Sequence, residues 1–173
     1  TLLELCVVLL AGLSVYALHP GNDRREPRWP APDPVLAGYT RALLPFIVLV
    51  AGYVLWAGSH RAGGAFQAGS ILAGAGVLWV LSHGGAGPDI ARGWVRLALV
   101  AGVTAFCGLG LILLPGGGAF LQWPPQAAKA LIVSIESAAT VSIAITLVLL
   151  FRAGLDLLIP IPGAEAGGEG GGA

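Results

Sequence analysis

One acidic residue stands inside a long apolar stretch of the sequence. Glu136 lies within the run from Ala127 to Phe151, and most of the residues around it are apolar. If this run crosses a bilayer, an ionised carboxylate within it costs several kcal/mol, so the residue is by default a candidate for function. A carboxyl group in such a place suits a proton carrier or a Na⁺ ligand, and Ser137 and Thr140 supply oxygen atoms on nearly the same helix face. The structural alternative is an anchor that hydrogen-bonds to a partner helix.

Two histidines near the ends of apolar runs are further candidates. His60 lies in a short connector, and His83 lies at the end of the apolar run that follows this connector. Imidazole gains or loses its charge near neutral pH, so each side chain could relay protons. The alternative for both is an interfacial residue at the membrane surface. The candidates for an ion or proton path are therefore Glu136, Ser137, Thr140, His60 and His83.

Other kinds of site have no support in the sequence. Cys6 and Cys107 each stand within an apolar run and form no CxxC or metal-ligand spacing. Gly63-Gly64-Ala65 lacks both the lysine and the preceding strand of a phosphate-binding loop. We therefore expect no catalytic residues, no metal, no cofactor and a protein that is not an enzyme. The formal net charge of zero, without a basic patch, gives nucleic-acid binding no support.

The elements that carry these residues follow from the composition. Of 173 residues, 56% are hydrophobic and 10% are charged, whereas soluble domains carry about 25% charged residues. So few charges cannot cover a small water-soluble fold, and apolar runs of this length match membrane-spanning helices. The sequence therefore predicts an all-α integral membrane protein with about five transmembrane helices. The runs are Leu2–Leu18, Tyr39–Ala57, a third that follows the connector 58–69 and ends at Leu81, Trp94–Leu114 and Ala127–Phe151.

The basic residues predict that the N-terminus lies outside and the C-terminus inside. With this orientation only Arg61 and Lys129 fall outside, in keeping with the excess of basic residues found in cytoplasmic loops. The residues that fall inside are Arg24, Arg25, Arg28, Arg41, Arg92, Arg96 and Arg152. We divide the chain into an extra N-terminal helix (1–19), a Pro/Arg-rich connector (20–38), a four-helix membrane domain (39–152) and an interfacial segment with a flexible Gly-rich tail (153–173).

Two of the predicted helices carry a face of small residues. Lipid is as apolar as leucine, so membrane helices associate through close packing at small residues and through buried polar contacts. We expect each face to meet another helix, although glycine and alanine are also simply abundant in this chain. The faces consist of Ala65, Gly69 and Ala73, and of Ser134, Ala138, Ser142 and Thr146.

The middle of the chain resembles a known family. Arg41-Ala42-Leu43-Leu44-Pro45-Phe46 opens the second run, and Gly58, followed by Gly63-Gly64-Ala65-Phe66-Gln67-Ala68-Gly69, joins it to the third. This pattern resembles the MnhB (or MrpB) family of subunits from Mrp-type multisubunit Na⁺/H⁺ antiporters, which typically has a Gly-His-x-x-Pro-Gly-Gly-Gly-Phe connector at this place. Related subunits occur in membrane-bound hydrogenases. The resemblance covers roughly Arg41 to Arg152.

By this resemblance, the connector keeps the family's motif at five positions, and the family tends to carry an acidic residue near Glu136. The chain departs from the motif at three places: Ser59 stands for the histidine, with His60 one residue later, Ala62 for the proline and Ala65 for the third glycine. The first helix and the Pro/Arg-rich connector lie outside the family's usual four-helix core. The matching motif positions are Gly58, Gly63, Gly64, Phe66 and Gly69.

The resemblance implies a small accessory subunit of a multisubunit cation (Na⁺)/proton antiporter, spanning the cell membrane several times. Its partners would be the lipid bilayer and other integral membrane subunits, including large complex I-like antiporter subunits. We expect it to contribute to assembly, and a place in the ion or proton path is the finer hypothesis. Two alternatives stay open: a purely structural subunit, and a membrane-arm subunit of an antiporter-like redox complex related to hydrogenases or complex I.

Overall fold

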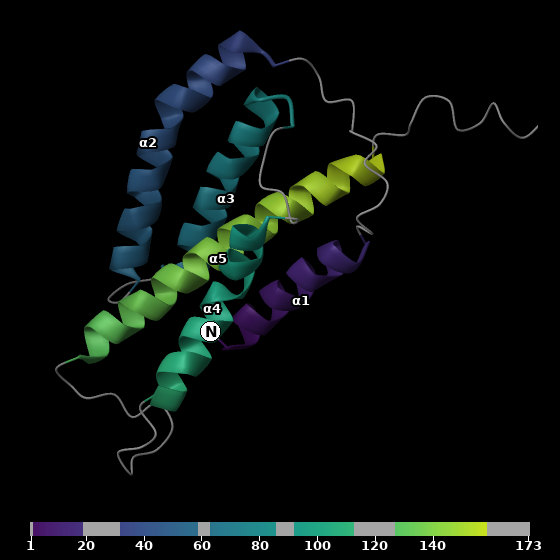
Figure 1. The fold of residues 1–173 in the computed structure, drawn as a ribbon. Coiled ribbons are helices and arrows are strands. Elements are labelled where there is room, and N and C mark those ends of the chain that lie inside the picture. Colours follow the sequence, from purple (N-terminus) through teal and green to yellow (C-terminus); the bar gives the residue numbers. More distant parts are fainter. Residues whose placement is uncertain (1, 19–31, 59–62, 86–91, 113–126, 159–173) are drawn as a thin grey trace, which may run out of the picture.

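The structure is a computed structural model that describes residues 2–18, 32–58, 63–85, 92–112 and 127–158. These ranges contain helices and no strand, so the predicted all-α fold is confirmed (Figure 1). His60, the basic residues Arg24, Arg25, Arg28 and Arg61, and the predicted flexible tail lie outside the described residues. The helices are α1 (Leu2–Leu18), α2 (Pro34–Ala57), α3 (Ala65–Ser82), α4 (Gly93–Ile112) and α5 (Ala128–Leu158).

Four of these helices are long and apolar enough to cross a membrane. The candidate spans in α2, α3, α4 and α5 have 24, 18, 20 and 28 residues. Because a helix rises 1.5 Å per residue, about 20 residues cross the hydrocarbon of a bilayer. The chain is thus a multi-pass membrane protein, as predicted. α1 has 17 residues, which is at the lower end of the spanning range, so a fifth crossing by α1 stays a prediction.

α5 is the helix around which the others are arranged (Figure 1). It packs most extensively against α3 and α4, and it also contacts α1, whereas α2 packs mainly on α3. Successive helices from α2 to α5 run in opposite directions, so the start of α2 and the end of α5 lie at the same end of the bundle. The 31 residues of α5 give it a length of about 46 Å, more than the hydrocarbon thickness, and it crosses the other helices obliquely.

The start of α2 shows how one helix boundary is fixed. The helix begins at Pro34 rather than at Tyr39, where the predicted apolar run began. Asp33 precedes it as the N-cap, and its Oδ1 accepts a hydrogen bond from the backbone N–H of Val35 at 2.9 Å. Proline suits the first helical position because the missing N–H would have no partner there. Asp33-Pro34 is therefore a helix start, and the proline-rich connector ends before it.

The small residues of α3 lie against α5, as their spacing predicts. A Cβ added to Gly69 would lie 2.8 Å from the Cβ of Ile143, and one added to Gly76 would lie 2.5 Å from Cγ2 of Val148. Both distances are shorter than real Cβ contacts, so only glycine allows this approach of the two backbones. Further along the same interface Ala73 and Val80 are buried with Val148.

A second face of α5 meets α4 and α1. Ser142 donates a hydrogen bond from Oγ to the backbone oxygen of Leu99 on α4. On α1, a Cβ added to Gly12 would lie 3.4 Å from Cδ2 of Leu99 and 3.7 Å from Cγ2 of Thr146. Ser142 and Thr146 are buried, whereas Ser134 of the same predicted face is exposed. The small polar face of α5 therefore meets other helices at Ser142 and Thr146 and not at Ser134.

Replacing Gly69 with valine is expected to destabilise the protein. The new side chain would overlap Ile143 and approach the backbone oxygen of Thr140, which lies 3.0 Å from the position that the new Cβ would take. Overpacking a tight contact costs about 1–3 kcal/mol, so the apparent melting temperature of the detergent-solubilised protein should fall. Gly74→Ala on the same helix is the control, because its Cβ would meet no atom within 4 Å. Equal melting temperatures for the two variants would contradict this packing.

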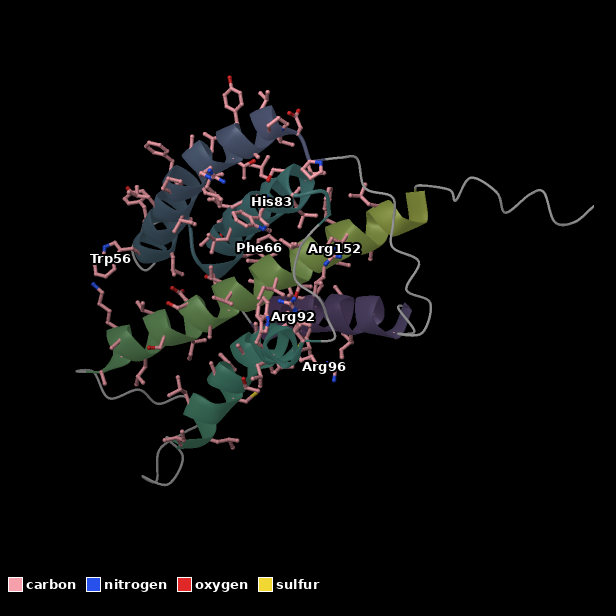
Figure 2. The ribbon with its side chains drawn as sticks, turned by 45° about the horizontal axis from the view of Figure 1, so that its top comes forward. Trp56, Phe66, His83, Arg92, Arg96 and Arg152 are labelled. Atoms are coloured by element: carbon pink, nitrogen blue, oxygen red, sulfur yellow. The ribbon has the colours of Figure 1, made fainter. Side chains whose placement is uncertain are left out.

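The orientation predicted from the basic residues can be tested at the two ends of α5. Arg92, Arg96 and Arg152 lie toward one end of the bundle (Figure 2), and Lys129 lies in the first turn of α5, at the other end. In a chain whose native cysteines are replaced by serine, we expect Lys129→Cys to react with a membrane-impermeant maleimide in intact cells. Arg152→Cys should react only after permeabilisation. The opposite pattern would place the C-terminal end of α5 outside and contradict the predicted orientation.

Candidate functional site

Glu136 lies on α5 close to the level at which α3 begins. The hydroxyl of Thr140, one helical turn further along α5, donates to the backbone oxygen of Glu136 at 2.7 Å and to that of Ala65 at 3.3 Å. Ala65 is the first residue of α3. Because Thr140 is level with this first residue, Glu136 lies about one turn beyond it, beside the connector that joins α2 to α3.

This level is nearer to the N-terminal end of α5 than to its C-terminal end. At that end Nζ of Lys129 lies 4.9 Å from the centre of the Trp56 ring, and Figure 2 shows Trp56 at the end of α2. Tryptophan and lysine are typical of the interface between hydrocarbon and headgroups. The rise along α5 from Lys129 to Glu136 is about 10 Å, so the carboxyl group has a short route to water on this side.

One carboxylate oxygen of Glu136 has no hydrogen-bond partner among the described residues. The side chain as a whole is half-buried, but its Oε2 is fully buried. A buried charged oxygen without a partner carries its full cost of desolvation. A proton, a cation or a donor group of another subunit would each remove that cost. Within the described residues no three His, Cys, Asp or Glu side chains gather into a metal site.

Ser137 lies next to Glu136, but its hydroxyl is engaged within α5. Its Oγ donates to the backbone oxygen of Val133 at 2.7 Å. This bond uses the single hydroxyl proton, although the oxygen can still accept a hydrogen bond or coordinate a cation. Of the two hydroxyls predicted to stand beside Glu136, only that of Thr140 also links α5 to another helix.

The two described ends of the connector between α2 and α3 lie close together. A Cβ added to Gly58 would lie 2.5 Å from the backbone nitrogen of Gly64, and one added to Gly63 would lie 2.9 Å from the backbone oxygen of Val54. Gly64 is the N-cap of α3 and has a φ of 123°, a conformation that residues with a side chain rarely adopt. These three motif glycines therefore set where α3 begins, and with it the level of Ala65.

The other two motif residues lie on α3 itself. Gly69 faces Ile143 of α5, so its role in the structure is close packing. Phe66 is 43% exposed, and its ring therefore lies partly on the surface of the bundle. The glycine positions of the motif thus have a geometrical explanation in this chain, whereas the exposed ring of Phe66 is available to lipid or to another subunit.

His83 lies at the opposite end of α3. It follows the last turn of the helix and stacks on Trp79, with ring centroids 4.0 Å apart. Its Nδ1 lies 2.9 Å from Oγ of Ser82 and 3.0 Å from the backbone oxygen of Trp79. The 18 residues of α3 separate this end from Ala65 by about 27 Å. The predicted candidates therefore do not form one cluster: Glu136, Ser137 and Thr140 lie near the connector, His83 lies far from it, and His60 is outside the described residues.

Two buried polar residues, Thr40 and Ser142, were not predicted as site residues. Thr40 on α2 is 1% exposed, and its Oγ1 has no hydrogen-bond partner among the described residues. A single threonine in an apolar run has no spacing that marks it, so the sequence contains no signal for this residue. Ser142 was predicted only as a packing residue, and its hydrogen bond to Leu99 of α4 depends on a helix contact that spacing alone does not specify.

Comparison with known protein families gives a match, which covers α2 to α5. A family model described as a domain related to the MnhB subunit of Na⁺/H⁺ antiporters matches residues 35–158, which is well over half of the 173-residue chain. The match includes the connector glycines and Glu136, and α1 lies outside it. No curated protein and no solved structure gives a match.

Replacing Gly58 with alanine is expected to displace the start of α3. The added methyl group would meet the backbone nitrogen and Cα of Gly64 at 2.5 and 2.6 Å, and backbone atoms cannot rotate away as a side chain can. We expect a loss of about 1–3 kcal/mol, visible as a smaller folded peak in size-exclusion chromatography of a fluorescent fusion. Gly52→Ala on α2 is the control, since its Cβ meets nothing within 4 Å. A normal peak for Gly58→Ala would show that the connector is not closed in this way.

Proposed function

The chain belongs to the family of domains related to the MnhB subunit of Na⁺/H⁺ antiporters, and from this premise we propose that Glu136 takes part in the ion or proton path of a multisubunit antiporter. The chain is then a small accessory subunit that performs no chemistry of its own. It contributes to assembly through its helix surfaces and contributes one carboxyl group to transport. The observation that carries the second role is the buried Oε2 of Glu136, which has no hydrogen-bond partner within the part of the chain that the structure describes.

The surroundings of Glu136 support a group that binds and releases a small cation. A carboxylate can accept a proton, and together with neutral oxygens it can also coordinate a hard cation such as Na⁺. Neutral oxygens on the neighbouring turn are the hydroxyl of Ser137 and that of Thr140, which donates to the backbone oxygens of Glu136 and Ala65. The interface marked by Trp56 and Lys129 lies about 10 Å away along the helix, which gives a short route for exchange with water.

The uncovered apolar surface of α2 is where a partner subunit could pack. α2 packs mainly on α3, and several large side chains along it point outward. In the bilayer this apolar surface is covered by lipid or by the helices of other subunits. The family resemblance makes large complex I-like antiporter subunits the expected neighbours. The exposed residues include Phe46, Leu49, Tyr53 and Trp56.

A purely structural role for Glu136 is the second candidate, and one observation favours it. The N-cap of α3 is Gly64, which has no side chain to bind the free N–H groups of the first turn. A carboxylate close to the start of a helix interacts favourably with its positive end. In this alternative Glu136 holds α5 against α3, and its replacement would release the subunit from the complex instead of impairing transport in an intact one.

Glu136→Gln is expected to impair transport while the complex still assembles. Glutamine keeps the size of the side chain but can neither carry a proton nor provide a negative charge. We expect cation-dependent proton antiport, measured by fluorescence quenching in everted membrane vesicles, to fall at least about tenfold. Ser134→Ala is the matched control on the same helix, because Ser134 is exposed and its hydroxyl bonds only within α5.

Assembly is measured in the same preparations by native gel electrophoresis and by mass spectrometry of the subunits that co-purify with the tagged chain. Normal antiport by Glu136→Gln in an intact complex would exclude a direct role for the carboxyl group. Loss of the variant chain from the complex would support the structural alternative. Co-purified iron–sulfur or nickel subunits would instead place the chain in a redox complex.

A further inference from the structure

A cavity of about 180 Å³ lies between α1, α4 and α5. Leu9 and Leu13 of α1 form one wall, and Leu99 and Val100 of α4 form another. Arg96 is the charged member of the lining. The cavity is therefore a largely apolar groove with a guanidinium group on its wall, on the side of α5 that faces α1 and α4.

The position of Arg96 places this charge near the membrane surface. It lies in the first turn of α4, toward the end of the bundle where Arg92 and Arg152 are also found (Figure 2). The first turn of a helix adds a positive partial charge of its own. Leu99 and Val100 lie about one turn deeper, so the groove leads from a positively charged rim toward the hydrocarbon.

We propose that this groove binds an anionic phospholipid, with the phosphate on Arg96 and one acyl chain along Leu13, Leu99 and Val100. A guanidinium group binds phosphate through two parallel hydrogen bonds. Arg96 also has an interaction within the chain, but its five N–H donors allow it to bind a phosphate as well. Basic pockets between membrane helices bind anionic headgroups in this way.

The shape of the groove favours a lipid chain over a protein helix. One turn of a helix with its side chains, about 10 Å across and 5.4 Å long, fills about 400 Å³, more than the cavity of about 180 Å³, whereas an acyl chain is thin and flexible. α1 approaches α4 and α5 closely at Gly12, while the larger Leu9 and Leu13 stand on the groove wall. A zwitterionic lipid would fit the apolar part equally well, but it would bring a positive group near Arg96.

The test uses the full chain, purified in mild detergent with the subunits that accompany it. Palmitoyl-oleoyl phosphatidylglycerol and the matching phosphatidylcholine are added in turn, and bound lipid is counted by native mass spectrometry. Arg96→Gln is expected to weaken phosphatidylglycerol binding about fivefold and to leave phosphatidylcholine unchanged. Arg41→Gln, on α2 and away from the groove, is the matched control and should behave like the unmodified chain.

Two further variants keep the test decisive if Arg96→Gln folds poorly. Arg96→Lys retains the charge and should retain a preference for phosphatidylglycerol, whereas Val100→Trp fills the groove and should weaken the binding of both lipids. The proposal is overturned if Arg96→Gln keeps the full preference, or if glycerophosphoglycerol alone binds as tightly as the intact lipid. It is also overturned if a photo-crosslinker at Leu13 captures a neighbouring subunit instead of phosphatidylglycerol.

Discussion

The close approach of α3 to α5 is the contact on which the rest of the structure depends. Within a bilayer the hydrophobic effect does not drive two apolar helices together, so they associate only where their surfaces fit closely. Here the fit comes from Gly69 and Gly76, whose missing side chains admit Ile143 and Val148. The same approach brings the hydroxyl of Thr140 to the backbone oxygen of Ala65. The level of Glu136 relative to the connector is a consequence of this packing.

On the other side of α5, hydroxyl groups contribute contacts beside the apolar cluster of Val95 and Leu149. Ser142 bonds to a backbone oxygen of α4, and Thr146 bonds within its own helix while facing Gly12 of α1. Such small polar residues are effective between membrane helices, because they satisfy their own hydrogen bonds and still allow a close approach. α5 therefore holds α3 on one face and α4 with α1 on another.

Much of this fold could be predicted from the sequence, because length and apolarity alone specify a membrane helix. The face of Ala65, Gly69 and Ala73 also predicted a contact correctly, since four-residue spacing places small residues on one side. The start of α2 at Pro34 was missed because a proline-rich segment suggests a connector, although aspartate followed by proline is a helix start.

The candidate site was harder to predict than the fold. The depth of Glu136 depends on where α3 begins, and that depends on contacts between backbone atoms of the connector that residue types do not reveal. The separation of His83 from Glu136 depends likewise on the direction in which α3 runs.

The packing that positions Glu136 also restricts the route that an ion could take. Along the α3–α5 interface, from Glu136 toward the end that carries Arg152, the side chains of Ile143, Val80 and Val148 are buried and apolar. A cation or a proton cannot follow this interface without polar groups or water to accompany it. Glu136 is only half-buried, so its side chain also reaches the surface of the bundle. If the carboxyl group serves transport, the remaining part of the path must then lie between this chain and a neighbouring subunit. An accessory subunit of this kind would contribute one wall of an ion path, and the opposite wall would belong to its partner.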